Sequence, residues 1–127
     1  MKTTVIHEKN AWNKWTDAKL QALENAKSNV KVGGKIVFEN DEFLVWSIHL
    51  PQGETVPFHK HCKRYFWTAL SAGKSKSYHN DGSISETEYE QGDTKYFDDL
   101  NEDNLFIHNL ENIGDTTLVF TTVEFKR

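Results

Sequence analysis

From residue 30 onwards, the sequence alternates short runs of β-branched and aromatic residues with groups of turn-forming residues. Clear apolar runs occupy residues 35–38 and 118–123. Turn-forming residues separate such runs at positions 39–42, 51–53, 72–73, 80–82 and 112–115. Val, Ile, Thr and aromatic residues favour strands, whereas Gly, Pro, Asn and Asp favour turns. This spacing predicts an all-β fold, a sandwich or a jelly-roll barrel, and not alternating strands and helices.

One segment before these strands has a helical period. Between Asn10 and Lys27, small and apolar residues recur near the helical repeat, and Gly33 and Gly34 follow beyond its end. The recurring positions are Trp12, Trp15, Ala18 or Lys19, Ala22, Leu23 and Ala26. We therefore predict one short N-terminal helix over residues 10–27, with its tryptophans packed on the barrel or on a second subunit.

The length of 127 residues suits one domain with one hydrophobic core. We expect residues 1–127 to form a single domain. Residues 1–30 would be an N-terminal extension that contains the helix, and residues 31–127 would be the barrel. A barrel of this size leaves the tryptophan face of the helix and the strand edges to be covered, so we also expect a homodimer.

Charge and composition exclude several classes of partner. The net charge is -4, and Lys and Arg are interleaved with Asp and Glu, so no basic face is available for nucleic acid. The N-terminal residues lack an apolar stretch of signal-peptide length, and no later segment approaches membrane-spanning length. A single cysteine, Cys62, rules out an internal disulfide. We expect a cytoplasmic protein that binds neither nucleic acid nor membranes.

Two histidines, His59 and His61, are separated by one residue in a predicted strand. Strand residues advance ~3.3 Å each, so the two side chains leave the same face with roots ~6.6 Å apart and can both reach one metal ion. Tyr65 has the same parity, so all three would point inward if the extended chain is unbroken. Such a pair also occurs on solvated strand faces, and the surrounding sequence decides between the two interpretations.

Alternation within the predicted strands defines an interior. Trp46, Ile48 and Leu50 share one face, and Tyr65, Trp67 and Ala69 share another. The interior of the barrel is where we expect a small-molecule site.

The order Gly53, five residues, His59-Lys60-His61, three residues, Tyr65, seven residues, Gly73 resembles the first conserved motif of the cupins. In that motif a turn glycine precedes His-x-His, and an inward acidic ligand usually follows. The segment from His108 to Asn112, followed by Gly114 and Asp115, resembles the end of the second cupin motif. The resemblance covers roughly residues 36–125. It implies a jelly-roll β-barrel in which His108 supplies a third metal ligand from across the barrel.

Two departures from the cupin pattern shape the expected site. Tyr65 stands where the acidic ligand usually lies, so the resemblance implies a three-histidine site. The stretch between Gly92 and His108 is long, lacks Pro-x-Gly and contains an acidic run at residues 98–104 that could cover the mouth of the barrel. The tyrosine and a final strand ending near Glu124 resemble the small cupins named for β-alanine degradation.

Neighbouring reactive residues are expected to lie outside the site. Cys62 and Arg64 have the opposite parity to His61 and Tyr65 and should point away from the metal. Cys62 is interpreted as a semi-buried apolar residue, with a reactive thiol as the alternative. The other histidines, His7, His49 and His79, are expected to be surface or structural residues.

The expected ligand set leaves open positions on one divalent ion, as a catalytic site requires. Iron would suggest dioxygen chemistry on a small organic acid, diketone or thiol. Zinc, nickel or manganese would suggest Lewis-acid chemistry, such as isomerase, lyase or hydrolytic reactions. The first hypothesis is a metalloenzyme of small-molecule catabolism, with His59, His61 and His108 as ligands and Tyr65 as the catalytic residue that positions substrate.

Two other functions compete with this hypothesis. The first is a non-catalytic, metal-containing module that binds or senses a small ligand. The scarcity of inward acid or base residues near the histidines supports it. The second is a metal-free structural cupin, which is disfavoured because all three histidines are kept in register.

Overall fold

The computed structural model describes all of residues 1–127, and antiparallel strands make up most of it. The chain forms ten strands, one α-helix and one 3-10 helix, η1. In chain order these are β1 (Lys2–His7), η1 (Trp12–Lys14), α1 (Asp17–Asn25), β2 (Lys35–Glu39), β3 (Phe43–Leu50), β4 (Thr55–His61), β5 (Tyr65–Ala69), β6 (Gly73–Tyr78), β7 (Ile84–Tyr89), β8 (Thr94–Phe97), β9 (Phe106–Asn112) and β10 (Leu118–Phe125).

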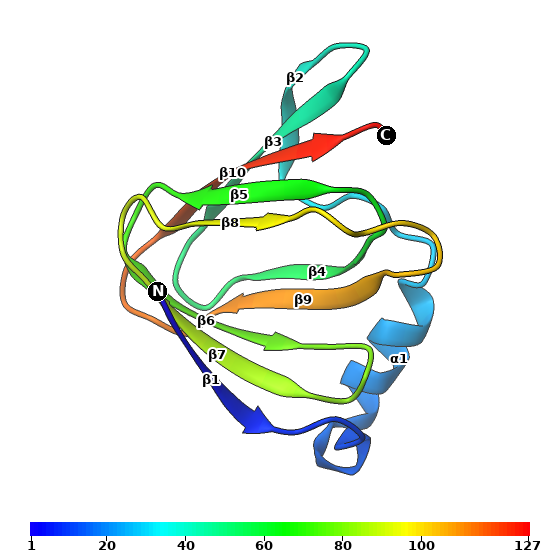
Figure 1. The fold of residues 1–127 in the computed structure, drawn as a ribbon. Helices are drawn as coiled ribbons and strands as arrows, with labels where there is room; N and C mark the ends of the chain where they lie inside the picture. Colours follow the sequence, from blue (N-terminus) through cyan, green and yellow to red (C-terminus); the bar gives the residue numbers. More distant parts are fainter.

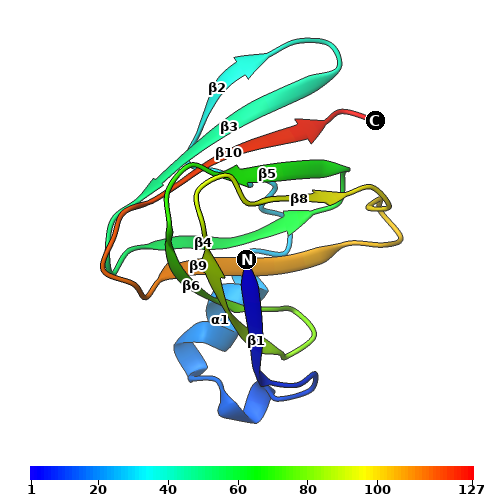
Figure 2. The same ribbon diagram turned by 60° about the vertical axis from the view of Figure 1, so that its left-hand side comes forward.

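The strands form two five-stranded sheets, with the orders β1-β7-β6-β9-β4 and β2-β3-β10-β5-β8. Figure 1 shows the two sheets facing each other as the walls of a flattened barrel, with α1 packed against the outside of the first sheet. The hairpin of β2 and β3 projects beyond the barrel in both views (Figures 1 and 2). This architecture confirms the all-β, jelly-roll expectation.

Strict alternation places one face of each central strand in the core. Along β10, every second residue is buried, from Leu118 to Glu124. Phe120 lies directly opposite Ile48 of β3 on one side and Ala69 of β5 on the other. Burying an aliphatic or aromatic side chain of this size stabilises the fold by ~1.5–3 kcal/mol. The main core cluster comprises Ile48, Leu50, Val56, Ala69, Tyr89, Leu118 and Phe120.

The N-terminal helix packs on the barrel through a second cluster, in which Trp15 is the largest side chain. Its ring stacks on Phe58 of β4 at 5.9 Å, and its indole N–H donates to the carbonyl of Gly82 at 3.2 Å. Trp15 is 6% exposed and Trp12 is 37% exposed, so only Trp15 is buried against the barrel. Lys19 of α1 also forms an ion pair with Glu111 of β9.

The continuous helix predicted over residues 10–27 is wrong in extent. The chain forms one 3-10 turn, becomes extended at Trp15, and begins α1 only after Thr16. The Thr16 hydroxyl accepts the backbone N–H of Lys19 at 3.2 Å, which is the hydrogen bond of a helix N-cap. Trp15 is buried in the core although its backbone is extended and it precedes α1. The helical spacing of apolar residues in the sequence therefore continues across a break in the helix. No helix in the structure is long and apolar enough to cross a membrane.

Strand β1 was not predicted from the sequence. It pairs antiparallel with β7 at the edge of the first sheet, with Lys2 opposite Glu88 and Thr3 opposite Thr87. Almost all of β1 is exposed, so it has no alternation of apolar and polar residues that would reveal it. An edge strand of this kind depends on backbone pairing with its neighbour, which the sequence pattern does not show.

The segment between α1 and β2 closes the barrel where the edge strand β4 faces β3. The carbonyl of Asn29 accepts the backbone N–H of Lys60 at 2.7 Å, and the N–H of Gly34 donates to Ser47 at 3.0 Å. A side chain at Gly33 would meet Trp46, because a Cβ there would lie 2.6 Å from the tryptophan Cβ. This close approach buries Val32, which is 2% exposed, between the sheets.

Candidate metal centre

The three predicted ligands come from two neighbouring strands, β4 and β9. His59 lies directly opposite His108, and His61 lies opposite Phe106. His108 therefore reaches the site from the adjacent strand of the same sheet. The expectation that it comes from across the barrel is wrong, because β9 pairs with β4 and not with a strand of the facing sheet.

A bulge in β4 produces this register. Val56 pairs with Leu110 but His59 pairs with His108, so β4 contains one extra residue between these pairs. Pro57 lies in the bulge, where the missing proline N–H does not interrupt a regular ladder. The extra residue turns His59 to the same face as His108, and both side chains line the interior.

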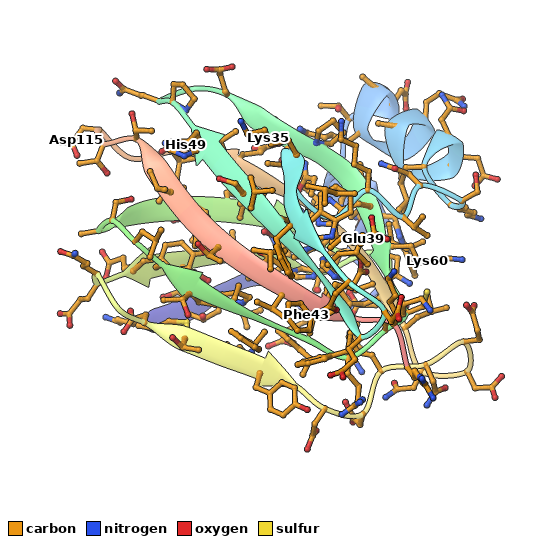
Figure 3. All side chains as sticks on the ribbon, turned by 90° about the horizontal axis from the view of Figure 1, so that it is seen from above. Lys35, Glu39, Phe43, His49, Lys60 and Asp115 are labelled. Atoms are coloured by element: carbon orange, nitrogen blue, oxygen red, sulfur yellow. The ribbon has the colours of Figure 1, made fainter.

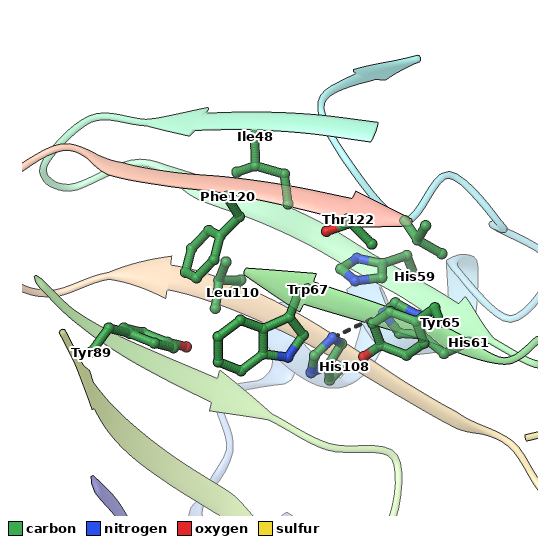
Figure 4. A pocket seen from close by; sticks show the side chains of 11 residues that line it. Ile48, His59, His61, Tyr65, Trp67, Tyr89, His108, Leu110, Phe120 and Thr122 are labelled. Atoms are coloured by element: carbon green, nitrogen blue, oxygen red, sulfur yellow. Dashed lines mark hydrogen bonds between the residues drawn. The ribbon is translucent and has the colours of Figure 1, made fainter. Parts of the chain in front are cut away.

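The imidazole nitrogens of the three histidines converge. One nitrogen from each ring can be chosen so that all three lie within 4.8 Å of one another. The Nε2 atoms of His61 and His108 are 3.2 Å apart (Figure 4). Two nitrogens bound ~2.1 Å from one ion at tetrahedral or octahedral angles would lie roughly 3.0–3.4 Å apart, so this pair fits a shared metal.

The ring nitrogens that face away from the cluster differ between His59 and His61. The Nδ1–H of His59 donates to the Pro57 carbonyl at 2.7 Å, which leaves Nε2 with its lone pair free. Metal-binding histidines commonly have their second nitrogen held in this way. The Nδ1 of His61 is buried without a hydrogen-bond partner. A buried polar atom left unpaired is costly and often marks a functional position.

Burial keeps all three imidazoles neutral. His59 and His61 are 3% and 2% exposed. Desolvation lowers the pKa of His59 to about 4, although its bond to Pro57 opposes the shift. Desolvation, followed by repulsion from the neighbouring histidines, lowers the pKa of His61 and of His108 well below the usual value. A divalent ion requires neutral imidazole ligands, and these are neutral at physiological pH.

Tyr65 lies beside the histidines at the start of β5, in the facing sheet. The extended chain is interrupted at residues 62–64, so the assumption of an unbroken strand from His61 to Tyr65 is wrong. Tyr65 nevertheless points inward, and its ring stacks between His61 at 4.1 Å and Phe97 at 4.8 Å. Burial raises the pKa of its hydroxyl well above the usual value, so the phenol is neutral and can donate a hydrogen bond.

A cavity of about 60 Å³ extends from the histidines between the two sheets. It is lined by Val32, Ile48, His59, His61, Tyr65, Trp67, Tyr89, His108, Leu110, Phe120 and Thr122. The histidines and Tyr65 occupy one end, and Tyr89 and Phe120 occupy the other (Figure 4). Sequence reasoning did not assign Tyr89, Phe120 or Thr122 to the site. The alternation along β10 could have indicated Phe120 and Thr122.

The remaining histidines lie outside the ligand cluster. His79 is half-buried, and its Nε2 lies 3.0 Å from the Ser85 hydroxyl, so it has a structural partner. Its ring centre is 5.7 Å from that of His108, although sequence parity gave no sign of this proximity. His49 is exposed on β3 (Figure 3).

Cys62 and Arg64 also face away from the metal ligands, as parity predicted. Arg64 donates to the Tyr96 hydroxyl at 3.2 Å and to the Arg127 carbonyl at 2.6 Å. Cys62 lines a separate groove with Glu102. Burial and the carboxylate of Glu102 raise the pKa of the Cys62 thiol, which favours the apolar interpretation of Cys62 over a reactive thiolate.

The acidic segment at residues 98–104 connects β8 to β9. Asn101 and Asn104 exchange two backbone hydrogen bonds, of 3.0 and 3.1 Å, and the preceding Leu100 is buried. None of its residues lines the histidine cavity. Its acidic side chains are therefore not part of the ligand-binding wall.

Comparison with known proteins supports the fold. No family model matches the sequence, and no curated protein matches it. A cupin domain from Bordetella pertussis is 22% identical, covers 73% of this chain and 91% of its own, and has a TM-score of 0.62. An uncharacterised protein with a double-stranded β-helix domain from Klebsiella pneumoniae is 18% identical, with coverages of 84% and 85% and a TM-score of 0.57.

A third solved structure agrees with these two. A cupin family protein with a double-stranded β-helix fold from Methanocaldococcus jannaschii is 20% identical, with coverages of 72% and 76% and a TM-score of 0.56. The narrower resemblance to the β-alanine-degradation cupins is not confirmed by these comparisons. At these identities the similarity concerns the fold, and the chain has the fold of a small cupin, a double-stranded β-helix.

Proposed function

We propose that this protein binds one divalent metal ion through His59, His61 and His108 and acts as a metalloenzyme on a small molecule held in the adjacent cavity. The observation that carries the proposal is the convergence of three buried imidazoles, from two directly paired strands, at one end of a cavity between the sheets. The spacing of the His61 and His108 nitrogens supports a shared ion.

Three protein ligands leave coordination positions for water or substrate, which distinguishes a catalytic site from a closed structural one. A bound ion would supply dioxygen activation if it is iron, or polarisation of a carbonyl or carboxylate if it is zinc, nickel or manganese. Imidazole ligands suit all four metals, so the ligand residues do not select among these chemistries.

The residues around the ion have separate roles in this proposal. His59 is held in the ligating tautomer by the Pro57 carbonyl. Tyr65, with a neutral phenol fixed between two rings, positions the substrate by donating a hydrogen bond from its hydroxyl. Val32 and the aromatic side chains of the cavity limit the access of water to the bound molecule.

A non-catalytic ligand-binding or sensor module is the second candidate. One observation favours it: no carboxylate or amine lines the cavity, so few groups there can transfer a proton. Both candidates require the metal and the cavity, and they differ in whether the bound molecule is converted.

Turnover by defined metal forms separates the two candidates. Iron, zinc, nickel and manganese forms would be screened for oxygen uptake and product formation against small carboxylates, diketones and thiols. Turnover by one form supports the enzyme. Tight binding of a molecule that no metal form converts supports the sensor.

A further inference from the structure

The cavity beside the histidines contains no charged side chain. Seven of its eleven lining residues are hydrophobic, and the others are the three histidines and Thr122. Lysine, arginine, aspartate and glutamate are all missing from this lining, although they are common elsewhere in the chain.

We propose that the ligand is a small, largely apolar molecule with a single polar head, which binds at the histidines, and an uncharged tail that packs against Trp67, Tyr89 and Phe120. This inference rests on the proposed function and narrows it. A carboxylate is acceptable as the head, where the ion would neutralise it. A second charged group on the tail is excluded.

The end of the cavity that lies away from the histidines suits an apolar tail. The rings of Trp67, Tyr89 and Phe120 contact one another edge to face, with centres 5.0–5.6 Å apart. The hydroxyl of Tyr89 is already hydrogen-bonded to Ser75 at 2.8 Å. Three mutually packed aromatic rings offer dispersion contacts and no group that could balance a charge.

The lysine nearest to the ligands in the sequence also lies outside this cavity. Lys60 lies between two of the ligands, but it projects to the other side of β4. There it lines a separate groove together with Lys63 and Glu102. An anionic tail inside the barrel would lose its hydration without gaining a cationic partner.

A pair of metal-binding probes with the same head tests the proposal. Benzohydroxamate and 4-carboxybenzohydroxamate share the chelating group and the ring, and they differ by one carboxylate on the tail. Both would be titrated into the cobalt(II)-loaded protein and followed by the visible absorbance of cobalt. We expect the uncharged probe to bind at least ~100-fold more tightly, because the buried carboxylate is unpaired. Equal or tighter binding of the carboxylated probe would overturn the proposal.

A charge introduced into the wall should reverse this preference. Leu110 follows His108 by two residues on β9 and lines the cavity. Leu110→Lys is expected to tighten binding of the carboxylated probe at least ~10-fold and to weaken binding of the uncharged probe. Leu70→Lys, at a residue that is 49% exposed, is the matched control and should change neither affinity. Loss of selectivity in the control as well would count against the cavity as the binding site.

A measurement without metal separates this inference from the proposed function. Binding of benzyl alcohol and of benzoate to the metal-free protein would be followed by NMR shifts of the Trp67 indole. We expect benzyl alcohol to bind more tightly than benzoate. If cobalt does not bind, the proposed function fails, while a preference for benzyl alcohol still supports the apolar cavity. If cobalt binds and benzoate is preferred without it, the apolar-tail inference fails alone.

Discussion

The Nε2 atom of His61 lies 3.2 Å from that of His108, whereas the Nδ1 atom of His61 is buried with no partner. The first distance suits two nitrogens that would bind the proposed metal ion, whereas the unpaired Nδ1 atom costs folding free energy. An unpaired buried polar group destabilises a protein by ~1–3 kcal/mol. Such a residue is retained where function requires it, at the expense of stability.

Replacement of His61 by leucine should therefore separate stability from metal binding. We expect His61→Leu to raise the unfolding free energy of the metal-free protein by ~1–2 kcal/mol, since an apolar side chain removes the unpaired nitrogen. The same change should abolish stoichiometric metal binding. Urea denaturation of both metal-free proteins measures the first effect. A large loss of stability would show that the imidazole is a satisfied structural residue.

The buried histidines predict that the metal-free protein loses stability in acid. The pKa of His59 is about 4 in the folded protein, against ~6.5 in an unfolded chain. Between these values the unfolded chain binds a proton that the folded protein does not, so the unfolding free energy falls as the pH falls. His59 alone contributes up to ~1.4 kcal/mol per pH unit, and His61 and His108 shift in the same direction.

Urea denaturation at about pH 7 and about pH 5 would measure this loss. His49→Ala is the control, because His49 is exposed and should leave the pH dependence unchanged. Equal stability at the two pH values would mean that the three imidazoles are not held neutral.

Tyr65→Phe tests the proposed positioning hydroxyl. The ring stacks between His61 and Phe97, and phenylalanine keeps that packing, so fold and metal content should be unchanged. If Tyr65 donates a hydrogen bond in the transition state, turnover should fall by ~10²–10³-fold. Steady-state kinetics with the best substrate would show this as a lower kcat. Unchanged kinetics would make Tyr65 only part of the wall.

The exposed apolar residues of β2 predict a homodimer. Ile36 is 45% exposed, and Val37 and Phe38 are each 53% exposed, on a hairpin that projects from the barrel (Figures 1 and 2). Because Trp15 is already buried against the barrel, β2 is the surface that we expect a second copy to cover. Light scattering at micromolar concentration should give twice the chain mass. Val37→Glu should give a monomer, and Ile113→Glu on a distant turn should not. A monomeric unaltered protein would refute the prediction.

Local periodicity explains which parts of this fold the sequence revealed. Parity within a single strand correctly placed Trp46, Ile48 and Leu50 in the core, because the strand has one face packed in the core and the opposite face turned towards solvent. The same parity placed His59 and His61 inward, and the resemblance to cupin motifs added His108. All three conclusions depend on residues close together in sequence or on a motif.

Features that depend on distant partners were not visible. The bulge that sets His59 opposite His108 appears only when β4 is paired with β9. Strand β1 is defined by its pairing with β7, and the break before α1 by the cap at Thr16. The far end of the cavity combines Tyr89 from one sheet with Phe120 from the other, which no single-strand pattern brings together.

Metal analysis of protein purified without added metal tests the central claim most directly. Elemental analysis of the unaltered protein should find one equivalent of a divalent metal per chain, and the exposed-histidine variant His49→Ala should match it. The double variant His59→Ala, His61→Ala should lose the metal, because only His108 of the three ligands remains. A double variant that still carries one equivalent of metal per chain would contradict the assignment of the site.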